Sequence, residues 1–228
     1  MGLFKSDNKM FTDEDFRFAC RELDTPDTSD WEFFVESHNI KIYRQYNQNS
    51  GLYTYKVYGD LDVSPDLCAT VYMDYEYRCK WDDYVSELCP IKDGEKDGVY
   101  WRVKYPFPLS HRDSSALTFV SQYCYLTELR EFDINNKHVW VILCRSEQFS
   151  CMPEKSGVIR VDDYEQSLAL TYNKNGGTQA YMYYYDDPKG MIPTWLINWA
   201  AKIGVPGFLE QMVKACKGYN EYKESLPT

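Results

Sequence analysis

Large apolar residues recur every three or four positions in the segment from Ile192 to Cys216, IPTWLINWAAKIGVPGFLEQMVKAC. This spacing is typical of one face of an amphipathic helix. Pro206 cannot donate to the helical ladder and its ring crowds the turn before it, so we expect an interruption at residues 204–206. Polar and charged residues break the run too often for a membrane span, which needs about 20 mostly apolar residues. The helix is therefore predicted to lie on a surface instead of crossing a bilayer.

Two interpretations of this helix follow from its pattern. In the commoner arrangement it is a terminal helix that packs on the core of the domain. In the other it is a movable lid over a lipid-sized cavity, and Trp195 and Trp199 sit at a membrane surface. The sequence before the helix is needed to choose between these two interpretations.

Two further helices are predicted in the first third of the chain. Thr12 is the cap of a helix with an acidic first turn and one apolar side. Ser64 is the cap of a second helix, with Pro65 at its first position. The stretch from Trp81 to Pro90 is interpreted as helical or irregular.

Two-residue alternation predicts strands through most of the remaining chain. Residues 39–44 and 52–61 are expected to form a hairpin around a turn at 48–51. Meandering strands with helices at both ends indicate an α+β fold with an antiparallel sheet. No linker or repeat divides residues 1–228, so we expect one domain with its core over about 11–222. The later strands are predicted at 99–108, 116–126, 137–146, 156–172 and 178–187.

Alternation also assigns side chains to the two faces of these strands. Trp101, Tyr164, Gln166 and Tyr184 fall on faces that are otherwise largely aliphatic and are expected to point inward. Gln166 is unusual there, because a buried amide requires hydrogen-bond partners. It is either bonded to backbone or water, or it is a polar group inside an apolar tunnel.

Composition narrows the range of functions. The net charge is −10 and no basic run is available to neutralise a nucleic-acid backbone, so no nucleic-acid partner is expected. The same charge disfavours lasting adhesion to anionic membranes. The 8 cysteines form neither a CxxC pair nor a spaced Cys/His set, and we therefore expect no metal site. Aromatic residues make up 17% of the chain, which is typical of sheet cores or an amphiphilic pocket.

The first ten residues, MGLFKSDNKM, have too short an apolar portion for a secretory signal. Together with the free cysteines, this predicts a cytoplasmic protein. Gly2 and Ser6 match the N-myristoylation pattern, although matches this short often arise by chance. If Gly2 is acylated, a single chain gives only weak and reversible membrane attachment. Membrane association is thus expected to be transient.

Four longer segments carry a recognisable pattern: WDDYVSEL, VYWRVKYPFPLSHRD, SGVIRVDDYEQSLA and YMYYYDDPKGMIPTWLINWAAKIGVPGFLEQM. With the spacing between them, they closely resemble the START lipid-transfer family, and within it the carriers of phosphatidylcholine, from about Phe11 to Tyr222. The resemblance implies a helix-grip fold, in which a curved antiparallel sheet wraps around a long C-terminal helix and encloses a tunnel for one lipid. It also implies a monomeric carrier that moves one phospholipid between membranes, uses no cofactor and makes or breaks no bond.

The resemblance assigns a phospholipid-binding site residue by residue. The phosphate-binding arginine of the family aligns with Arg78, its nearby tyrosine with Tyr72, and its glutamine near the lipid glycerol with Gln166. A guanidinium suits a phosphodiester because its fork donates two hydrogen bonds to one charge. Without the resemblance, Arg78 would be interpreted as a surface partner of a nearby aspartate.

The choline cage of the family aligns with Trp101, Tyr164 and Tyr184. A quaternary ammonium donates no strong hydrogen bond, so it is held by the faces of aromatic rings, each contact worth about 0.5–2 kcal/mol. One wall departs from the family, because Ser114 stands where a tyrosine is expected. Ser114 can accept a hydrogen bond from a primary ammonium. Phosphatidylcholine is thus the expected ligand, with a relaxed selectivity over phosphatidylethanolamine as the alternative.

Three other functions compete with that of a carrier. A hydrolase would need an acid–base pair, but His38, His111 and His138 lie near turns or strand ends with no catalytic motif beside them. A lipid sensor would use the same pocket to control an unidentified protein partner, and the sequence leaves this open. A sterol ligand is disfavoured because it would leave Arg78 facing an apolar ring system.

Overall fold

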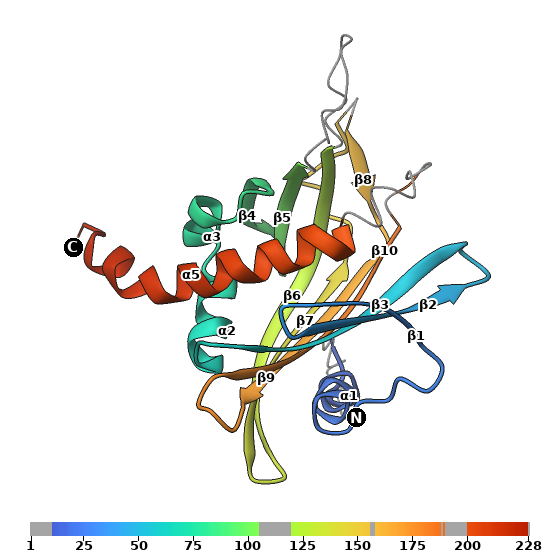
Figure 1. The fold of residues 1–228 in the computed structure, drawn as a ribbon. Coiled ribbons are helices and arrows are strands. Elements are labelled where there is room, and N and C mark those ends of the chain that lie inside the picture. The colour runs from blue at the N-terminus through green and yellow to red at the C-terminus, as the bar shows by residue number, and fades with distance from the viewer. Residues whose placement is uncertain (1–10, 105–119, 156–157, 188, 190–199, 228) are drawn as a thin grey trace, which may run out of the picture.

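The structure is a computed structural model that describes residues 11–104, 120–155, 158–187, 189 and 200–227 (Figure 1). Its centre is a single ten-stranded sheet. The helices are α1 (Asp13–Asp24), α2 (Pro65–Met73), α3 (Tyr75–Trp81), the π-helical turn η1 (Ala200–Gly204) and α5 (Val205–Glu224). The strands are β1 (Glu32–Ser37), β2 (Ile40–Asn47), β3 (Leu52–Leu61), β4 (Val85–Asp93), β5 (Lys96–Lys104), β6 (Val120–Ile134), β7 (Lys137–Ser146), β8 (Ile159–Val161), β9 (Tyr164–Tyr172) and β10 (Thr178–Asp186).

The strands follow the order β1-β2-β3-β10-β9-β7-β6-β5-β4 and pair antiparallel along this path. The short strand β8 pairs with β6 in parallel and lies off the path. The pairing of β3 with β10 joins the two ends of the chain in the middle of the sheet. The sheet curves, and α5 lies along its inner side (Figure 1).

Two layers of helix cover the two faces of the sheet. On the inner face, α2 and α5 contribute to the largest cluster of buried apolar side chains, which also takes residues from β5, β6 and β9. On the outer face, α1 packs Phe16, Ala19 and Leu23 against β7, β9 and β10. None of the helices in the described ranges is long and apolar enough to cross a membrane. The protein thus has the predicted α+β fold, in which a curved sheet grips the C-terminal helix.

The first helix begins where the sequence predicts it. The amide of Asp15 donates to Thr12 Oγ1 at 3.2 Å, and the amide of Thr12 donates back to Asp15 Oδ2 at 2.8 Å. This capping box satisfies two amides that would otherwise lack a partner in the first turn. Ser64 also precedes α2 with Pro65 at the first position, but its side chain makes no capping hydrogen bond. Ser64 therefore occupies the predicted N-cap position, although its side chain does not bond to the helix amides.

The C-terminal helix is interrupted at the predicted place. The wide turn η1 ends at Gly204, and α5 starts at Val205 with Pro206 in its first turn. A proline there costs no hydrogen bond, because the first amides of a helix have no partner within it. The helix then runs on to Glu224, further than the predicted end at Cys216. Residues 192–199 lie outside the described ranges.

The sequence-based prediction missed two strands, β4 and β1. The stretch from Trp81 to Pro90, interpreted as helical or irregular, is the end of α3 followed by strand β4. Pro90 is tolerated because β4 is an edge strand and pairs only with β5. Strand β1 is the other edge, and its half-exposed residues show no clear alternation. The predicted strand 156–172 is in fact split into β8 and β9 at Asp162 and Asp163.

Candidate functional site

The site that the sequence predicts is centred on Arg78, in the short helix α3. Its side chain is 5% exposed, and its Nε lies 3.0 Å from Oδ2 of Asp82, one turn later in the chain. The carbon at the centre of the guanidinium lies 4.8 Å from the ring centre of Tyr72, 5.3 Å from Trp101 and 5.4 Å from Phe208. The aspartate orients one edge of the guanidinium, and three rings surround it.

The surroundings of Arg78 keep it charged. Burial lowers the pKa of its guanidinium, but the neighbouring Tyr72 and Asp82 more than offset this, and the pKa is raised overall. The interpretation of Arg78 as a surface ion pair is thus wrong, since both side chains are buried. A buried ion pair contributes little net stability, because desolvation of the charges offsets their attraction. Stability alone therefore gives little reason for this ion pair to lie in the interior.

Gln166 is tied to two other residues of the predicted site. Its Nε2 donates to the Tyr72 hydroxyl at 2.7 Å, and its Oε1 accepts from the Tyr164 hydroxyl at 3.2 Å. Side chains therefore satisfy the buried amide, where one sequence interpretation expected backbone or water. Burial raises the pKa of both tyrosine hydroxyls, which stay neutral at physiological pH. The three residues form one hydrogen-bonded unit on the inner face.

The three predicted cage residues come together through a fourth aromatic residue. The rings of Tyr164 and Tyr184 are 5.8 Å apart in an edge-to-face arrangement. Trp101 lies 4.9 Å from Tyr123, and Tyr123 lies 5.3 Å from Tyr164. The indole Nε1 of Trp101 is buried and has no hydrogen-bond partner among the described residues. Tyr123 was missed in the sequence, although alternation within the strand 116–126 would have placed it on this face.

Asp186 is a second residue that sequence reasoning missed. It lies two positions after Tyr184 in β10 and is the register partner of Tyr164 in β9. Its Oδ2 accepts from the hydroxyl of Tyr123 at 2.8 Å and from that of Tyr184 at 3.0 Å. The residue is only partly covered, but the carboxyl group is densely surrounded, and this desolvation raises its pKa above the usual value. A carboxylate therefore borders the ring cluster.

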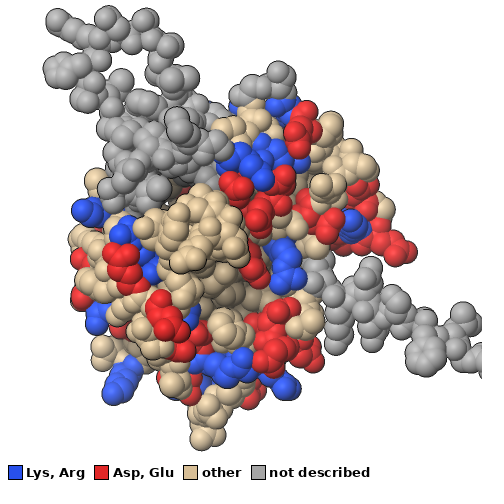
Figure 2. Space-filling model, turned by 90° about the vertical axis from the view of Figure 1, so that its right-hand side faces the viewer, with Lys and Arg blue, Asp and Glu red and all other residues tan. Residues whose placement is uncertain are grey.

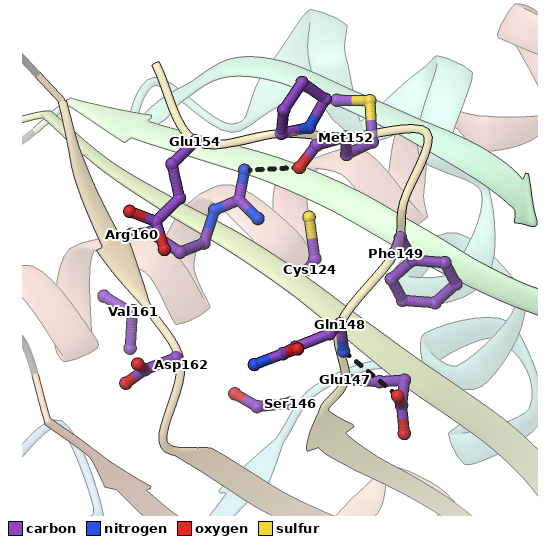
Figure 3. Close-up of a pocket in the computed structure, with 11 residues that line it drawn as sticks. Cys124, Ser146, Glu147, Gln148, Phe149, Met152, Glu154, Arg160, Val161 and Asp162 are labelled. Carbon is purple, nitrogen blue, oxygen red and sulfur yellow. Dashed lines mark hydrogen bonds between the residues drawn. The ribbon is translucent and has the colours of Figure 1, made fainter. Parts of the chain in front are cut away.

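A separate hollow of about 380 Å³ lies on the outer face of the sheet (Figure 3). Cys124, at its floor, packs with Tyr100, the neighbour of Trp101 that points to the opposite side of β5. Arg160 extends into the hollow and donates to the carbonyl oxygen of Met152 at 3.1 Å. The sheet separates this hollow from the predicted site. It is lined by Cys124, Ser146, Glu147, Gln148, Phe149, Met152, Pro153, Glu154, Arg160, Val161 and Asp162.

Several sequence-based predictions fall outside the described ranges. These are the gate residues Trp195 and Trp199, the altered cage wall Ser114, His111, and Gly2. The histidines that the structure does describe lie at the surface: His138 bonds to Asp133 and Glu131, and His38 to Ser37. On the face seen in Figure 2, acidic and basic side chains are interspersed around a central patch without charged groups.

The sheet and its helices define a helix-grip fold, in which charged and aromatic side chains lie on the inner face of the sheet. A START domain model matches residues 23–222, and the chain belongs to this family. Relatives include the phosphatidylcholine transfer proteins of Mus musculus, 49% identical over 92% of this chain and 96% of the relative, and of Homo sapiens, 47% identical over 92% and 95%.

Solved structures agree on the fold. The crystal structure of human STARD10 superimposes with a TM-score of 0.73 at 22% identity and covers 95% of this chain and 84% of that one. Human StAR-related lipid transfer protein 5 gives a TM-score of 0.70 at 14% identity, with coverage of 91% and 97%. At these identities the likeness concerns the fold alone. It agrees with the predicted helix-grip arrangement of sheet and C-terminal helix.

Proposed function

We propose that this protein extracts one phosphatidylcholine molecule from a membrane and carries it through water to another, without making or breaking a bond. Two kinds of support exist. Relatives that are 47–49% identical over 92% of the chain are phosphatidylcholine transfer proteins. The observation that carries the proposal is the charged Arg78, buried among aromatic rings on the inner face of the sheet.

In this proposal Arg78 binds the phosphate of the lipid. Asp82 takes the Nε side of the guanidinium and leaves the two terminal nitrogens for the phosphate oxygens. Tyr72, held by Gln166, adds a hydroxyl beside the guanidinium. The Nε1 of Trp101, which finds no partner in the described part of the chain, is a further donor for the ligand. A phosphodiester would replace the water that both groups lose on burial.

The rings of Trp101, Tyr164 and Tyr184 then hold the trimethylammonium group of choline. Such a cation is attracted to ring faces with about 0.5–2 kcal/mol per contact. Tyr123 connects two of these rings, since it contacts both Trp101 and Tyr164. Ser114 replaces one wall of the family cage, so phosphatidylethanolamine is the ligand most able to compete.

Entry of the lipid requires transient contact with a membrane. In the proposal, Trp195 and Trp199 insert at the interface while the helix around η1 opens. In the described part of that helix, Ile203 is exposed to solvent, at 59% of its full surface. Replacement of both tryptophans by alanine is expected to slow exchange with vesicles more than it weakens retention of bound lipid. Equal effects on exchange and on retention would mean that the helix serves only in packing. The carrier is proposed to work as a cytoplasmic monomer.

Transfer of fluorescent phosphatidylcholine between vesicles tests this function. Arg78→Lys keeps a positive charge beside Asp82 but loses the planar fork, so transfer should fall at least tenfold. Arg44→Lys is the matched control, because Arg44 also pairs with a carboxylate and lies over two rings, but at the surface. Circular dichroism should show both variants folded. Unchanged transfer by Arg78→Lys would remove Arg78 from the site.

A further inference from the structure

Asp186 occupies a particular place relative to the aromatic rings. It points to the same face of β10 as Tyr184, since the two are two positions apart, and it stands opposite Tyr164 in the register with β9. Both hydroxyls that bond to it, from Tyr123 and Tyr184, donate to the same oxygen, Oδ2. The carboxylate is thereby fixed in orientation, and Oδ1 has no hydrogen bond within the described residues.

No lysine, arginine or histidine of the described ranges forms an ion pair with Asp186. Asp187 and Asp163 lie close enough to repel it. The nearby Lys189 pairs with Asp187 and Asp162 instead. A desolvated carboxylate without a cation is costly, and an asparagine would accept the same two hydroxyl hydrogens at lower cost. The negative charge itself therefore requires an explanation.

Arg78 provides the contrast within the same inner face. Its charge is already balanced by Asp82, so Arg78, Asp82 and the carboxylate of Asp186 together leave one negative charge. A phosphate that binds Arg78 adds another negative charge. Only a ligand that also carries a cation, at the side of the rings, compensates Asp186. A zwitterion fits this distribution, and a purely anionic headgroup does not.

We propose that Asp186 is the counter-ion of the ligand ammonium group and selects zwitterionic phospholipids against anionic ones. This inference rests on the proposed function, since it concerns the same headgroup site. The rings hold the ammonium by their faces, while the carboxylate supplies the charge that neutral rings lack. A merely structural Asp186, which only anchors the two tyrosine hydroxyls, would have no effect on the choice between lipids.

Vesicles that contain equal amounts of phosphatidylcholine and phosphatidylglycerol distinguish these roles. After equilibration, mass spectrometry of the protein gives the ratio of the two lipids bound. Asp186→Asn keeps an acceptor for both hydroxyls but removes the charge, and the ratio should shift towards phosphatidylglycerol at least tenfold. Asp163→Asn, which removes a nearby exposed charge, is the matched control and should leave the ratio within twofold.

The outcomes separate the inference from the function on which it rests. If Asp186→Asn keeps the wild-type ratio, the inference is wrong, even though the wild-type protein still binds phosphatidylcholine. If the wild-type protein binds neither lipid, the proposed function itself is wrong, and the inference falls with it. If Asp186→Asn does not fold, the carboxyl pKa of Asp186 is measured by NMR in the wild-type protein with and without phosphatidylcholine. A drop on binding supports the counter-ion role, and an unchanged or raised pKa overturns it.

Discussion

Arg78 and Arg44 have similar partners in opposite environments. Each lies near a carboxylate, at 3.0 Å from Asp82 and 2.8 Å from Glu32, and each faces aromatic rings. The side chain of Arg78 is 5% exposed, whereas that of Arg44 is 20% exposed and its partner Glu32 57%. Solvent screens the second pair, so its net effect on stability is small. The buried pair carries the cost of desolvation, which a bound phosphate would help to offset.

The hydrogen bond from Gln166 to Tyr72 gives a first prediction at the residue scale. Tyr72→Phe leaves the buried amide without its acceptor and should destabilise the protein by about 1–3 kcal/mol, measured by urea denaturation. Tyr172→Phe is the control, because its hydroxyl bonds to Asp66 at the exposed surface. That variant should lower the free energy of unfolding by less than about 1 kcal/mol. Equal costs would mean that Gln166 finds another partner.

Acidification gives a second prediction at this scale. Burial raises the pKa of the Asp186 carboxyl, hydrogen bonds from Tyr123 and Tyr184 oppose the rise, and Asp187 and Asp163 add to it. A bound ammonium favours the carboxylate, so phosphatidylcholine lowers this pKa and its binding releases a proton. Affinity should therefore fall as the pH drops through the raised pKa, above the usual value of 3.8. Two tyrosines near this carboxyl, Tyr55 and the register partner of Asp186, Tyr164, have raised pKa values and stay neutral over this window.

Retention of phosphatidylcholine on the protein between pH 4 and pH 7, assayed by gel filtration, checks this dependence. Asp186→Asn removes the titrating carboxyl, so retention of the lipid should no longer depend on pH over the range in which Asp186 titrates. A variant as pH-dependent as the wild-type protein would assign the effect to other carboxyls.

At the scale of elements, the docking of α1 depends on a buried ion pair. Lys56 of β3 lies 2.7 Å from Glu22 of α1, with side chains only 5% and 7% exposed. The ammonium also donates to the carbonyl oxygen of Asp27, and the Tyr58 hydroxyl donates to Glu22. The pair therefore ties α1 to β3 on the outer face of the sheet.

Removal of one charge from this pair should be costly. Glu22→Gln leaves the buried Lys56 without its counter-charge, and we expect a loss of about 3 kcal/mol in the free energy of unfolding. Glu14→Gln, on the same helix, breaks a pair with Arg21 in which both side chains are more than half exposed, and should cost less than about 1 kcal/mol. Chemical denaturation of both variants measures the difference, and similar losses would contradict the role of burial.

Elements with a strong local signal could be predicted from the sequence, and those with a tertiary cause could not. Thr12 and the acidic turn after it fix the start of α1. Pro206 marks the interruption before α5. Pro90 was misleading, since only the position of β4 at the sheet edge permits a proline there. The split between β8 and β9 has no signal in the alternation, because it arises from the parallel pairing of β8 with β6.

The same division applies to the candidate site. Alternation places Trp101, Tyr164 and Gln166 on the inner face, and family resemblance singles out Arg78 as a ligand-binding group. Neither source points to Asp186, whose role depends on hydroxyls from β6 and β10 that meet only in the folded sheet. Which side chains meet across strands depends on strand order and register, and the alternation within a single strand does not reveal either.

At the scale of the whole molecule, the sheet predicts cooperative unfolding. Strand β10 lies between β3 and β9, so the N-terminal and C-terminal parts of the chain share one sheet. We expect a single thermal transition that is the same by fluorescence and by circular dichroism. Bound phosphatidylcholine at about 100 times its Kd should add about 2.7 kcal/mol of stability, which raises Tm by about 5–10 °C for a chain of this size. Two separate transitions would contradict a single domain.

The central claim is that the inner face binds one zwitterionic phospholipid, and native mass spectrometry tests it most directly. The purified protein is equilibrated with vesicles that contain equal amounts of phosphatidylcholine and phosphatidylethanolamine, and the bound lipid is identified. The account predicts one phospholipid per protein, with phosphatidylcholine in excess. Comparable amounts of the two lipids would mean that Ser114 relaxes the choice of headgroup. A protein that emerges without any phospholipid would contradict the claim.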